Sequence, residues 1–271
     1  AAEALRAATE RLAAVSDTAR LDAELLMAHA AGITREQLIL RLRDLGEPDG
    51  FAALVERRLG REPVSHITGR RDFWTLTLAV TRDVLAPRPD SETLIEAAVE
   101  HYRDGRGPRA ILDLGTGSGA LLLAALDEWR EARGLGIDIS AHALAVAREN
   151  AGRCGLEARA RFRPGNWCDG IAERFDLVLV NPPYIVASAA LPPEVLNHEP
   201  HIALFSGEDG LDACREIAVG LRRVMEPGAL ALVEIGFDQG ESAAGLFAGR
   251  GFRTELKRDL AGRARCLKLR R

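Results

Sequence analysis

Cysteine is scarce in this chain of 271 residues, and so are long apolar runs. The four cysteines form no CxxC pair and have no histidine at zinc-finger spacing, so the sequence indicates neither a metal site nor a disulfide framework. We interpret them as free, buried thiols: Cys154, Cys168, Cys214 and Cys266. Nowhere do about 18 consecutive apolar residues occur, which is the length that a membrane-spanning helix needs.

Lysine is nearly absent. Lys257 and Lys268 are the only lysines among the 36 basic residues. With 40 acidic residues, the net charge of the chain is -4. Such a chain is not suited as a whole to bind a phosphate backbone, so no direct nucleic-acid binding is expected. The first turns carry Glu3, Arg6 and Glu10, which leaves no apolar region for a signal peptide. We therefore expect a cytoplasmic protein without a membrane partner.

The remaining composition is that of a globular protein with a buried core, since 47% of the residues are hydrophobic and 28% are charged. The length favours two domains. Residues 1–60 hold short amphipathic runs at helical spacing, and Thr34 to Gln37 reads as a capping box. No period-two pattern occurs there. The sequence thus predicts a helical domain over residues 1–62.

A hairpin is predicted after this helical domain. From residue 63 the period of the apolar residues changes to two, most clearly in 73–80, so we expect a β-hairpin linker over 63–86. The prolines in 86–89 then hold the chain extended. A helix is expected to follow, with Asp90 or Ser91 as its N-cap.

Residues 87–271 alternate between strand-like and helix-like runs. This alternation predicts an α/β domain of Rossmann-like type, in which a mostly parallel sheet carries helices on both faces and a ligand crevice lies at the carboxyl ends of the strands. Two late runs are expected to pair as antiparallel strands. The expected strands are 110–114, 135–139, 175–180, 229–235, 253–257 and 265–269, and the expected helices are 120–129, 141–150 and 211–225.

The first of these strands runs into a glycine-rich turn, Gly115-Thr116-Gly117-Ser118-Gly119, which lets the backbone approach a ligand closely. The spacing of Gly115, Gly117 and Ala120 also fits a dinucleotide fingerprint, so NAD and other nucleoside cofactors stay open. The next strand reaches Asp138. Its carboxylate could accept both hydroxyls of a ribose, or it could cap the helix that begins near Ser140.

The strand 175–180 ends in Asn181-Pro182-Pro183-Tyr184, where two prolines fix the backbone at the crevice. An amide or ring amino nitrogen is a poor nucleophile because its lone pair is delocalised. The Asn181 side-chain oxygen and the Pro182 carbonyl can accept its hydrogens and aim the lone pair at a methyl donor. The Tyr184 ring can stack on the flat target group. With the glycine turn, this motif resembles the class I S-adenosylmethionine-dependent methyltransferases.

Further segments extend the resemblance over most of the chain, and with them the sequence is similar to the HemK/PrmC family. That resemblance implies methyl transfer from S-adenosylmethionine to the side-chain amide nitrogen (N5) of the glutamine in the Gly-Gly-Gln motif of class-1 peptide-chain release factors. The matching segments are Glu62-Pro63, Ile67-Thr68-Gly69, Phe73-Trp74, 87–92 and the stretch from Glu199-Pro200 to Gly210-Leu211.

The resemblance also implies site residues. The turn 115–119 would line the methionine and ribose of the cofactor, Asp138 would hold the ribose hydroxyls, and Trp167 would flank the adenine. Asn166 stands where many relatives have Asp, and its side-chain carbonyl could still accept a hydrogen bond from the adenine amino group. Asn181 would lie close to the cofactor as well as to the substrate glutamine, which the resemblance assigns to Asn181, Pro182, Pro183 and Tyr184. For Arg88 and Glu92 a structural ion pair is expected.

Two other functions compete with this one. The same motif serves amino groups of DNA or RNA bases, but residues 1–60 hold eight basic against ten acidic residues, a poor nucleic-acid module. The second alternative is a protein that binds a translation factor without catalysing a reaction. Such a protein would not need the intact motif Asn181-Pro182-Pro183-Tyr184. Because a pocket that holds one amide cannot select a single glutamine among many, we expect the helical domain to dock the release factor.

Overall fold

The computed structural model describes residues 1–271, which divide into two compact units. Unit 1 consists of Ala1–Arg70 together with Leu191–His198, and unit 2 consists of Arg71–Ala190 and Glu199–Arg271. The boundary thus falls at residues 70 and 71, later than the expected end of the helical domain. The sequence offered no sign that a segment near residue 195 joins the N-terminal unit.

Unit 1 is entirely helical, as predicted. Its first five helices pack through one apolar core that includes Leu12, Leu26, Leu38 and Phe51. The capping box is confirmed, because the Gln37 N–H donates to Thr34 Oγ1 (3.2 Å) and the Thr34 N–H donates to Gln37 Oε1 (3.0 Å). The helices are α1 (Ala2–Leu12), α2 (Ala19–Ala31), α3 (Arg35–Arg41), α4 (Phe51–Leu59), α5 (Val64–Thr68) and α9 (Pro193–Leu196).

The segment after residue 63 is only partly a hairpin. The prediction was wrong for its start, because Pro63 leads into the short helix α5, which ends at Gly69 in the left-handed conformation. The hairpin follows as β1 (Arg70–Phe73) and β2 (Leu76–Ala79). The expected continuous alternation breaks at Trp74, whose positive φ of 56° places it in the turn.

Side-chain contacts attach the segment 191–198 to the helices of unit 1. The rings of His66 and His198 meet edge to face with centroids 6.3 Å apart, and Arg61 Nη1 lies 3.5 Å from Glu194 Oε2. The chain therefore leaves unit 2 after Ala190, contributes α9 to unit 1, and returns to unit 2 at Glu199.

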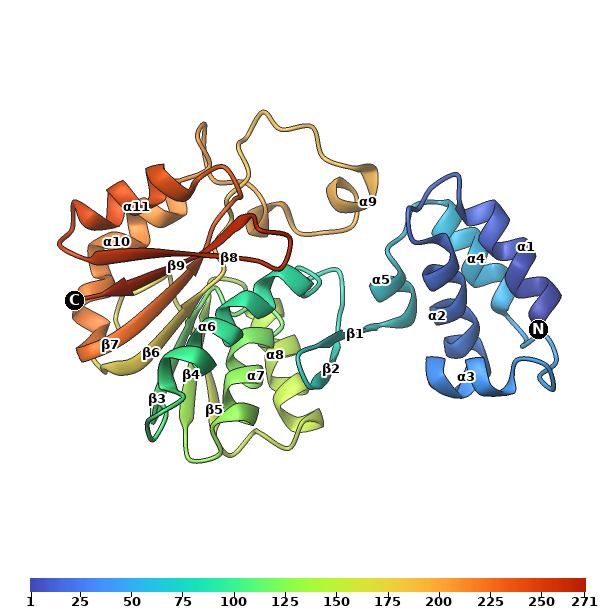
Figure 1. Ribbon diagram of the computed structural model, residues 1–271, viewed down its shortest axis with the longest axis horizontal. Coiled ribbons are helices and arrows are strands. Elements are labelled where there is room, and N and C mark those ends of the chain that lie inside the picture. Colours follow the sequence, from blue (N-terminus) through green and yellow to red (C-terminus); the bar gives the residue numbers. More distant parts are fainter. The chain divides into compact units, whose positions relative to one another are not determined.

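Unit 2 is built on a seven-stranded sheet of order β5-β4-β3-β6-β7-β9-β8, drawn in Figure 1. The pairs from β5 to β7 are parallel, and β9 runs antiparallel to both β7 and β8, which confirms the predicted closing pair. The strands are β3 (Ala110–Leu114), β4 (Arg133–Asp138), β5 (Ala160–Pro164), β6 (Phe175–Val180), β7 (Met225–Glu234), β8 (Arg253–Arg258) and β9 (Ala264–Arg270).

Helices cover both faces of this sheet, as the sequence predicted (Figure 1). The strand β5 and the helix α11 had not been expected. None of the helices combines the length with the apolar character that would let it cross a membrane. One face carries α6 (Glu92–Tyr102), α7 (Ala120–Glu128) and α8 (Ala141–Arg153), and the other carries α10 (Asp212–Val224) and α11 (Gly240–Ala248).

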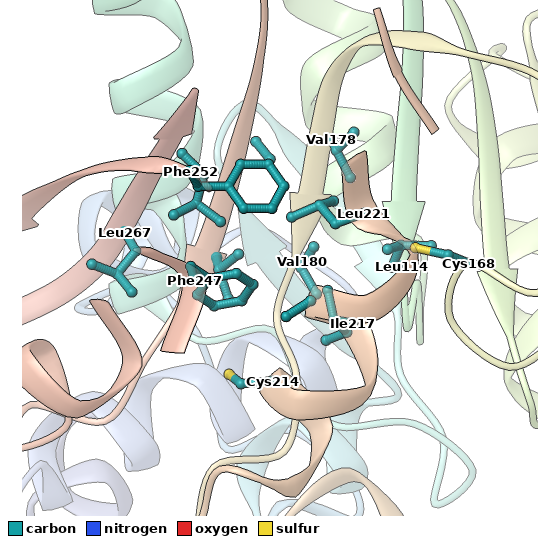
Figure 2. Packing of buried hydrophobic residues seen from close by; sticks show 14 of the residues in the cluster. Leu114, Cys168, Val178, Val180, Cys214, Ile217, Leu221, Phe247, Phe252 and Leu267 are labelled. Carbon is teal, nitrogen blue, oxygen red and sulfur yellow. The ribbon is translucent and has the colours of Figure 1, made fainter. Parts of the chain in front are cut away.

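Alternate residues of the central strands fill the two layers of core. Along β6, Leu177 and Leu179 pack with the helices α6 and α7, whereas Val178 and Val180 point to the opposite layer. Figure 2 shows this second layer, where Val180 lies close to Ile217 of α10. A strand buried on both faces reads as a continuous apolar run, which is why β6 was recognisable in the sequence.

The cysteines are free, and three of them lie in these core layers while Cys154 is half-buried. Burial raises the pKa of the Cys168 and Cys214 thiols to about 12. Both thiols therefore stay protonated at neutral pH, and they pack as small apolar side chains.

One buried polar side chain ties the hairpin to the sheet domain. Asn150 of α8 is fully buried, and its Oδ1 accepts from the Ala79 N–H (2.7 Å) while its Nδ2 donates to the Ala79 carbonyl (3.1 Å) and the Ser118 carbonyl (2.9 Å). The amide thus satisfies three backbone groups at once, two in the hairpin and one in the glycine-rich turn.

Replacing Asn150 by alanine is expected to lower the free energy of unfolding by about 3 kcal/mol, because it leaves these buried backbone groups without partners. Denaturation by urea, followed by circular dichroism, measures the loss. Glu149→Ala is the matched control on the same helix, since this exposed side chain takes part only in a surface ion pair. Equal stability of the two variants would contradict the proposed role of Asn150.

Candidate functional site

A cavity of about 410 Å³ lies at the carboxyl ends of the parallel strands, inside unit 2. This is where the sequence placed the crevice. The motif residues that line it come from the ends of β3, β4 and β6 and from the loop after β5. They are Gly115, Thr116, Gly117, Ser118, Asp138, Asn166, Trp167, Asn181 and Pro183.

The glycine-rich turn begins directly after β3 and is bound to the neighbouring strand. The N–H groups of Gly115 and Thr116 both lie 2.9 Å from the carbonyl oxygen of Ile137 in β4. Gly115, Gly117 and Gly119 all have positive φ, which few other residues adopt. The turn therefore needs its glycines for the backbone path itself.

Asp138, the last residue of β4, fixes the same turn from the other side. Its Oδ2 accepts from the Gly117 N–H (2.8 Å) and its Oδ1 from the Ser140 N–H (2.9 Å). Ser140, not Asp138, is the N-cap of α8, since the Ala143 N–H donates to Ser140 Oγ (3.2 Å). Each carboxylate oxygen of Asp138 keeps an unused lone pair for a ligand hydroxyl.

Asp113, within β3, was given no role by the sequence. Its side chain lies at the wall of the cavity, where Oδ2 accepts from the Thr116 hydroxyl (2.6 Å) and the buried Oδ1 has no hydrogen-bond partner. Burial raises the pKa of this carboxyl to about 7. Asp113 thus holds the turn through Thr116.

Asn166 and Trp167 follow β5 and form another wall of the cavity. Trp167 has a positive φ of 46°, and its ring lies over the bare Gly115, where a Cβ would approach the ring to 3.2 Å. The Asn166 Nδ2 group donates to Glu216 Oε2 (3.4 Å). Its carbonyl oxygen is therefore the atom left to accept a hydrogen bond from a ligand amino group.

The Asn-Pro-Pro-Tyr motif divides between the cavity and the interior. Asn181 and Pro183 line the cavity, while Pro182 is buried and neither it nor Tyr184 belongs to the lining. The Asn181 Nδ2 group donates to Ser91 Oγ (3.0 Å). This hydrogen bond leaves the Asn181 carbonyl oxygen as the free acceptor of the side chain.

Tyr184 lies near the buried carboxyl group of Glu234. Burial raises the pKa of this carboxyl to about 7. Burial likewise raises the pKa of the Tyr184 hydroxyl to about 12, so this phenol stays protonated. The expected stacking of the Tyr184 ring on a substrate group has no support in this position.

Two residues that the sequence analysis missed contact the backbone of the Asn-Pro-Pro-Tyr motif: Gln239 and Gly210. Gln239, just before α11, donates from Nε2 to the Tyr184 carbonyl (3.0 Å) and the Gly210 carbonyl (3.2 Å), and its Oε1 accepts from the Gly236 N–H (2.9 Å). Gly210 lies so close to Tyr184 that a Cβ would come within 2.3 Å of its carbonyl oxygen. Gln239 follows the end of β7 by five positions, and nothing in the sequence around it indicated this role.

The roles of Arg88 and Glu92 differ from each other. Arg88 lines the cavity and its Nη2 donates to both carboxylate oxygens of the buried Glu199 (2.7 and 2.8 Å), which confirms the expected ion pair. For Glu92 that expectation was wrong, since its carboxylate accepts from the backbone N–H of Trp74 (2.9 Å). Ser91 occupies the N-cap position of α6, as expected, but its side chain makes no capping hydrogen bond and binds Asn181, while Asp90 pairs with Arg265.

Comparison with protein families gives two matches. Residues 3–69 match the family described as PrmC N-terminal domain, and residues 109–237 match a family described as methyltransferase domain. The first match ends one residue before the boundary of unit 1 at Arg70, and the second spans the sheet from β3 to the end of β7.

Curated relatives match over nearly their whole length. The chain is 46% identical to the release factor glutamine methyltransferase of Cereibacter sphaeroides, with 100% of this chain and 98% of that protein covered. It is 45% identical to the protein of the same name from Caulobacter vibrioides, with 92% and 88% covered.

Solved structures show the same fold at lower identity. A ribosomal protein L11 methylase from Lactobacillus delbrueckii is similar with a TM-score of 0.51 and 22% identity, covering 68% of this chain and 80% of that one. A methyltransferase from Pyrococcus furiosus reaches a TM-score of 0.54 at 15% identity, covering 71% and 86%. At such identities the likeness concerns the fold alone.

Proposed function

The chain belongs to the release factor glutamine methyltransferases, and from this premise we propose that it transfers a methyl group from S-adenosylmethionine to the N5 nitrogen of the glutamine in the Gly-Gly-Gln motif of class-1 peptide-chain release factors. One observation of the site carries the proposal furthest. Asn181, at the wall of the cavity, has its NH2 group bound to Ser91 and its carbonyl oxygen free.

The protein is an S-adenosylmethionine-dependent methyltransferase. The cavity fits this cofactor in size, because its volume lies in the range of about 300 to 1,000 Å³ that is usual for small-molecule sites. Its residues fit as well, because Asp138 keeps a lone pair on each carboxylate oxygen for the hydroxyls of a ribose. Gly115 to Gly119 would hold the methionine and ribose, and Trp167 would flank the adenine. The Asn166 carbonyl would accept from the adenine amino group. When bound, the cofactor supplies an electrophilic methyl group.

The chain's own contribution to the reaction is orientation. The Asn181 carbonyl oxygen would accept one hydrogen of the substrate amide, and the carbonyl of Pro182, a residue just outside the cavity lining, would accept the other. These two acceptors favour a pyramidal nitrogen, whose lone pair is then free to attack. Pro183, which has no N–H, cannot compete for the Pro182 carbonyl. Holding the reacting nitrogen in this geometry replaces an acid–base relay as the source of the rate enhancement.

Replacing Asp138 by alanine is expected to weaken S-adenosylmethionine binding by about 1.5 to 3 kcal/mol, the effect of losing hydrogen bonds to a charged group. The loss includes the anchoring of Gly117, which Asp138 also binds. Titration calorimetry measures it. Asp127→Ala is the control, because that carboxylate is bonded to Thr75 outside the cavity. Unchanged affinity in a folded variant, or tighter binding of NAD by the parent protein, would contradict the assignment.

The proposed function is tested by incubating the protein with labelled S-adenosylmethionine and a purified release factor, followed by mass mapping of the modified residue. Label on the glutamine of the Gly-Gly-Gln motif is the expected result. Label on DNA or RNA in place of protein would favour the competing methylation of a base amino group.

The protein partner and the location follow from the same proposal. We assign the docking of the release factor to unit 1, since the cavity of unit 2 can recognise little more than one amide and the cofactor. We assign no nucleic-acid partner, and we place the protein in the cytoplasm, where its proposed substrate acts in translation termination.

A further inference from the structure

Gln239 is a nearly buried residue to which the proposed mechanism gives no task. It is the N-cap residue of α11 and is 7% exposed, yet its side chain makes no capping hydrogen bond. An N-cap side chain usually accepts a hydrogen bond from the first turn of its own helix. The carboxamide of Gln239 instead contacts three loops outside the helix, so its position requires another explanation.

The partners of the Gln239 carboxamide fix its direction. Its NH2 group donates to the Tyr184 carbonyl (3.0 Å) and the Gly210 carbonyl (3.2 Å), and its Oε1 accepts from the Gly236 N–H (2.9 Å). A carbonyl oxygen can only accept and a backbone N–H can only donate. A carboxamide turned by half a rotation would therefore lose all three hydrogen bonds. Gln239 thus joins the Asn-Pro-Pro-Tyr motif to the turn before α10 and to the loop after β7 in a single arrangement.

The Asn-Pro-Pro-Tyr motif is attached to the fold at both of its ends. Directly before it, Val180 pairs with both neighbouring strands of the sheet. The two prolines within the motif have no N–H to donate. Directly after it, Ile185 exchanges backbone hydrogen bonds with the segment 204–206. Gln239 adds a hydrogen bond from a side chain to the last residue of the motif itself, Tyr184.

The prolines make the motif a stiff unit between these attachments. Each proline fixes its own φ, and a residue that precedes a proline is restricted to extended backbone, which applies to Asn181 and to Pro182. Little torsional freedom therefore remains from Asn181 to Pro183. The direction in which the Asn181 side chain and the Pro182 carbonyl are aimed depends on where the two ends of the motif are held.

We propose that Gln239 is a positioning residue for methyl transfer. By holding the Tyr184 carbonyl, it aims the two acceptors of the motif at the substrate amide. This inference rests on the proposed function, which makes Asn181 and Pro182 those acceptors. Gly210 belongs to the same arrangement, since a Cβ there would come within 2.3 Å of the Tyr184 carbonyl oxygen and 2.5 Å of Gln239 Nε2. Only a glycine lets the two loops approach closely enough to share one side-chain donor.

Gln239→Met keeps the length of the side chain but removes its hydrogen bonds, and it should lower kcat on a release factor about tenfold, the rate equivalent of one hydrogen bond. KM and the affinity for S-adenosylmethionine should change less than about twofold, because Gln239 does not line the cavity. Glu241→Gln is the control, since that exposed side chain lies on the same helix. A full rate for Gln239→Met, or an equal loss of cofactor affinity, would overturn the proposal.

A second variant, Gln239→Glu, makes the missing hydrogen bond depend on pH. Its carboxyl group can still accept from the Gly236 N–H. The ionised carboxylate has no hydrogen to offer the Tyr184 carbonyl, whereas the protonated form has one. Burial raises the pKa of a carboxyl group above its usual value, so the variant gains this donor as the pH falls through the neutral range.

The kcat of Gln239→Glu, divided by the parental kcat at the same pH, should therefore rise about fivefold from about pH 8.5 to about pH 6. The same ratio for Gln239→Met should not depend on pH, because methionine does not titrate. A ratio for Gln239→Glu that stays constant would contradict the positioning role. If Gln239→Met fails to fold, this pH series decides the question by itself.

A measurement without turnover keeps this proposal apart from the proposed function. In the protein alone, the ¹³C resonance of the Pro182 carbonyl and the ¹⁵N side-chain resonance of Asn181 report how the motif is held. Gln239→Met should shift both resonances, and Glu241→Gln should shift neither. Unshifted resonances in Gln239→Met would overturn the positioning role, whereas failure of the parent protein to methylate any release factor would overturn only the proposed function.

Discussion

Replacement of Asn181 by alanine is expected to lower kcat on a release factor by about 10² to 10³, the usual cost of losing one preorganised polar partner of a transition state. The side-chain oxygen is the acceptor that the Ser91 hydrogen bond leaves free, and alanine offers nothing in its place. Binding of S-adenosylmethionine should weaken less, because the residues assigned to the ribose and adenine remain. Single-turnover kinetics at saturating cofactor isolates the chemical step.

A second asparagine of the cavity provides the matched control. Asn166 also lines the cavity, but we assign it to the adenine, so Asn166→Ala should weaken cofactor binding and leave kcat nearly unchanged at saturating cofactor. If instead Asn166→Ala lowered kcat and Asn181→Ala mainly weakened cofactor binding, Asn166 would be the acceptor for the substrate amide and Asn181 a cofactor-binding residue. Turnover near the parental level in Asn181→Ala would show that the reaction does not need a side-chain acceptor at this position.

The parts of the fold that were predictable are those whose pattern is local. The strands 110–114 and 175–180 were predicted to the residue, because each is a short apolar run between clear breakers. The strand β5 was missed for the opposite reason. It lies at the edge of the sheet with β4 as its only neighbour, and Arg161 and Arg163 interrupt its apolar pattern.

Candidate site residues were predictable where one short segment contains both the glycines or prolines that shape the backbone and the groups that would contact a ligand. The turn 115–119 and the motif 181–184 are such segments, and the structure brings residues of both to one cavity. The contact of Ser91 with Asn181 was not predictable, since the two residues stand 90 positions apart in the sequence and only the folded chain brings their side chains within 3.0 Å. A serine is not a distinctive residue type by itself.

The division into units shows the same limit. The helical domain was expected to end at residue 62, but the structure adds the helix α5 to it and places the boundary between Arg70 and Arg71. The membership of 191–198 in unit 1 depends on contacts across more than 120 positions, such as that between His66 and His198. No periodicity within an eight-residue segment can reveal such a contact.

This segment changes how the role of unit 1 must be tested. Truncation at residue 70 alone would leave 191–198 without the helices it packs on, and any loss of activity could come from that exposed piece. The test therefore uses a chain that begins at Arg71 and carries a Gly-Ser linker in place of Leu191–His198. The full-length chain with the same linker is the control, because it keeps Ala1–Arg70.

The shortened chain is expected to lose kcat/KM toward an intact release factor by roughly 10², because remote binding no longer positions the glutamine at Asn181. It should still fold and bind S-adenosylmethionine, since its core and cavity lie within unit 2. Its low activity on a short Gly-Gly-Gln peptide should stay at the level of the full-length protein, because such a peptide has no surface for unit 1 to recognise. Equal loss on both substrates, or none on either, would mean that unit 1 does not select the substrate.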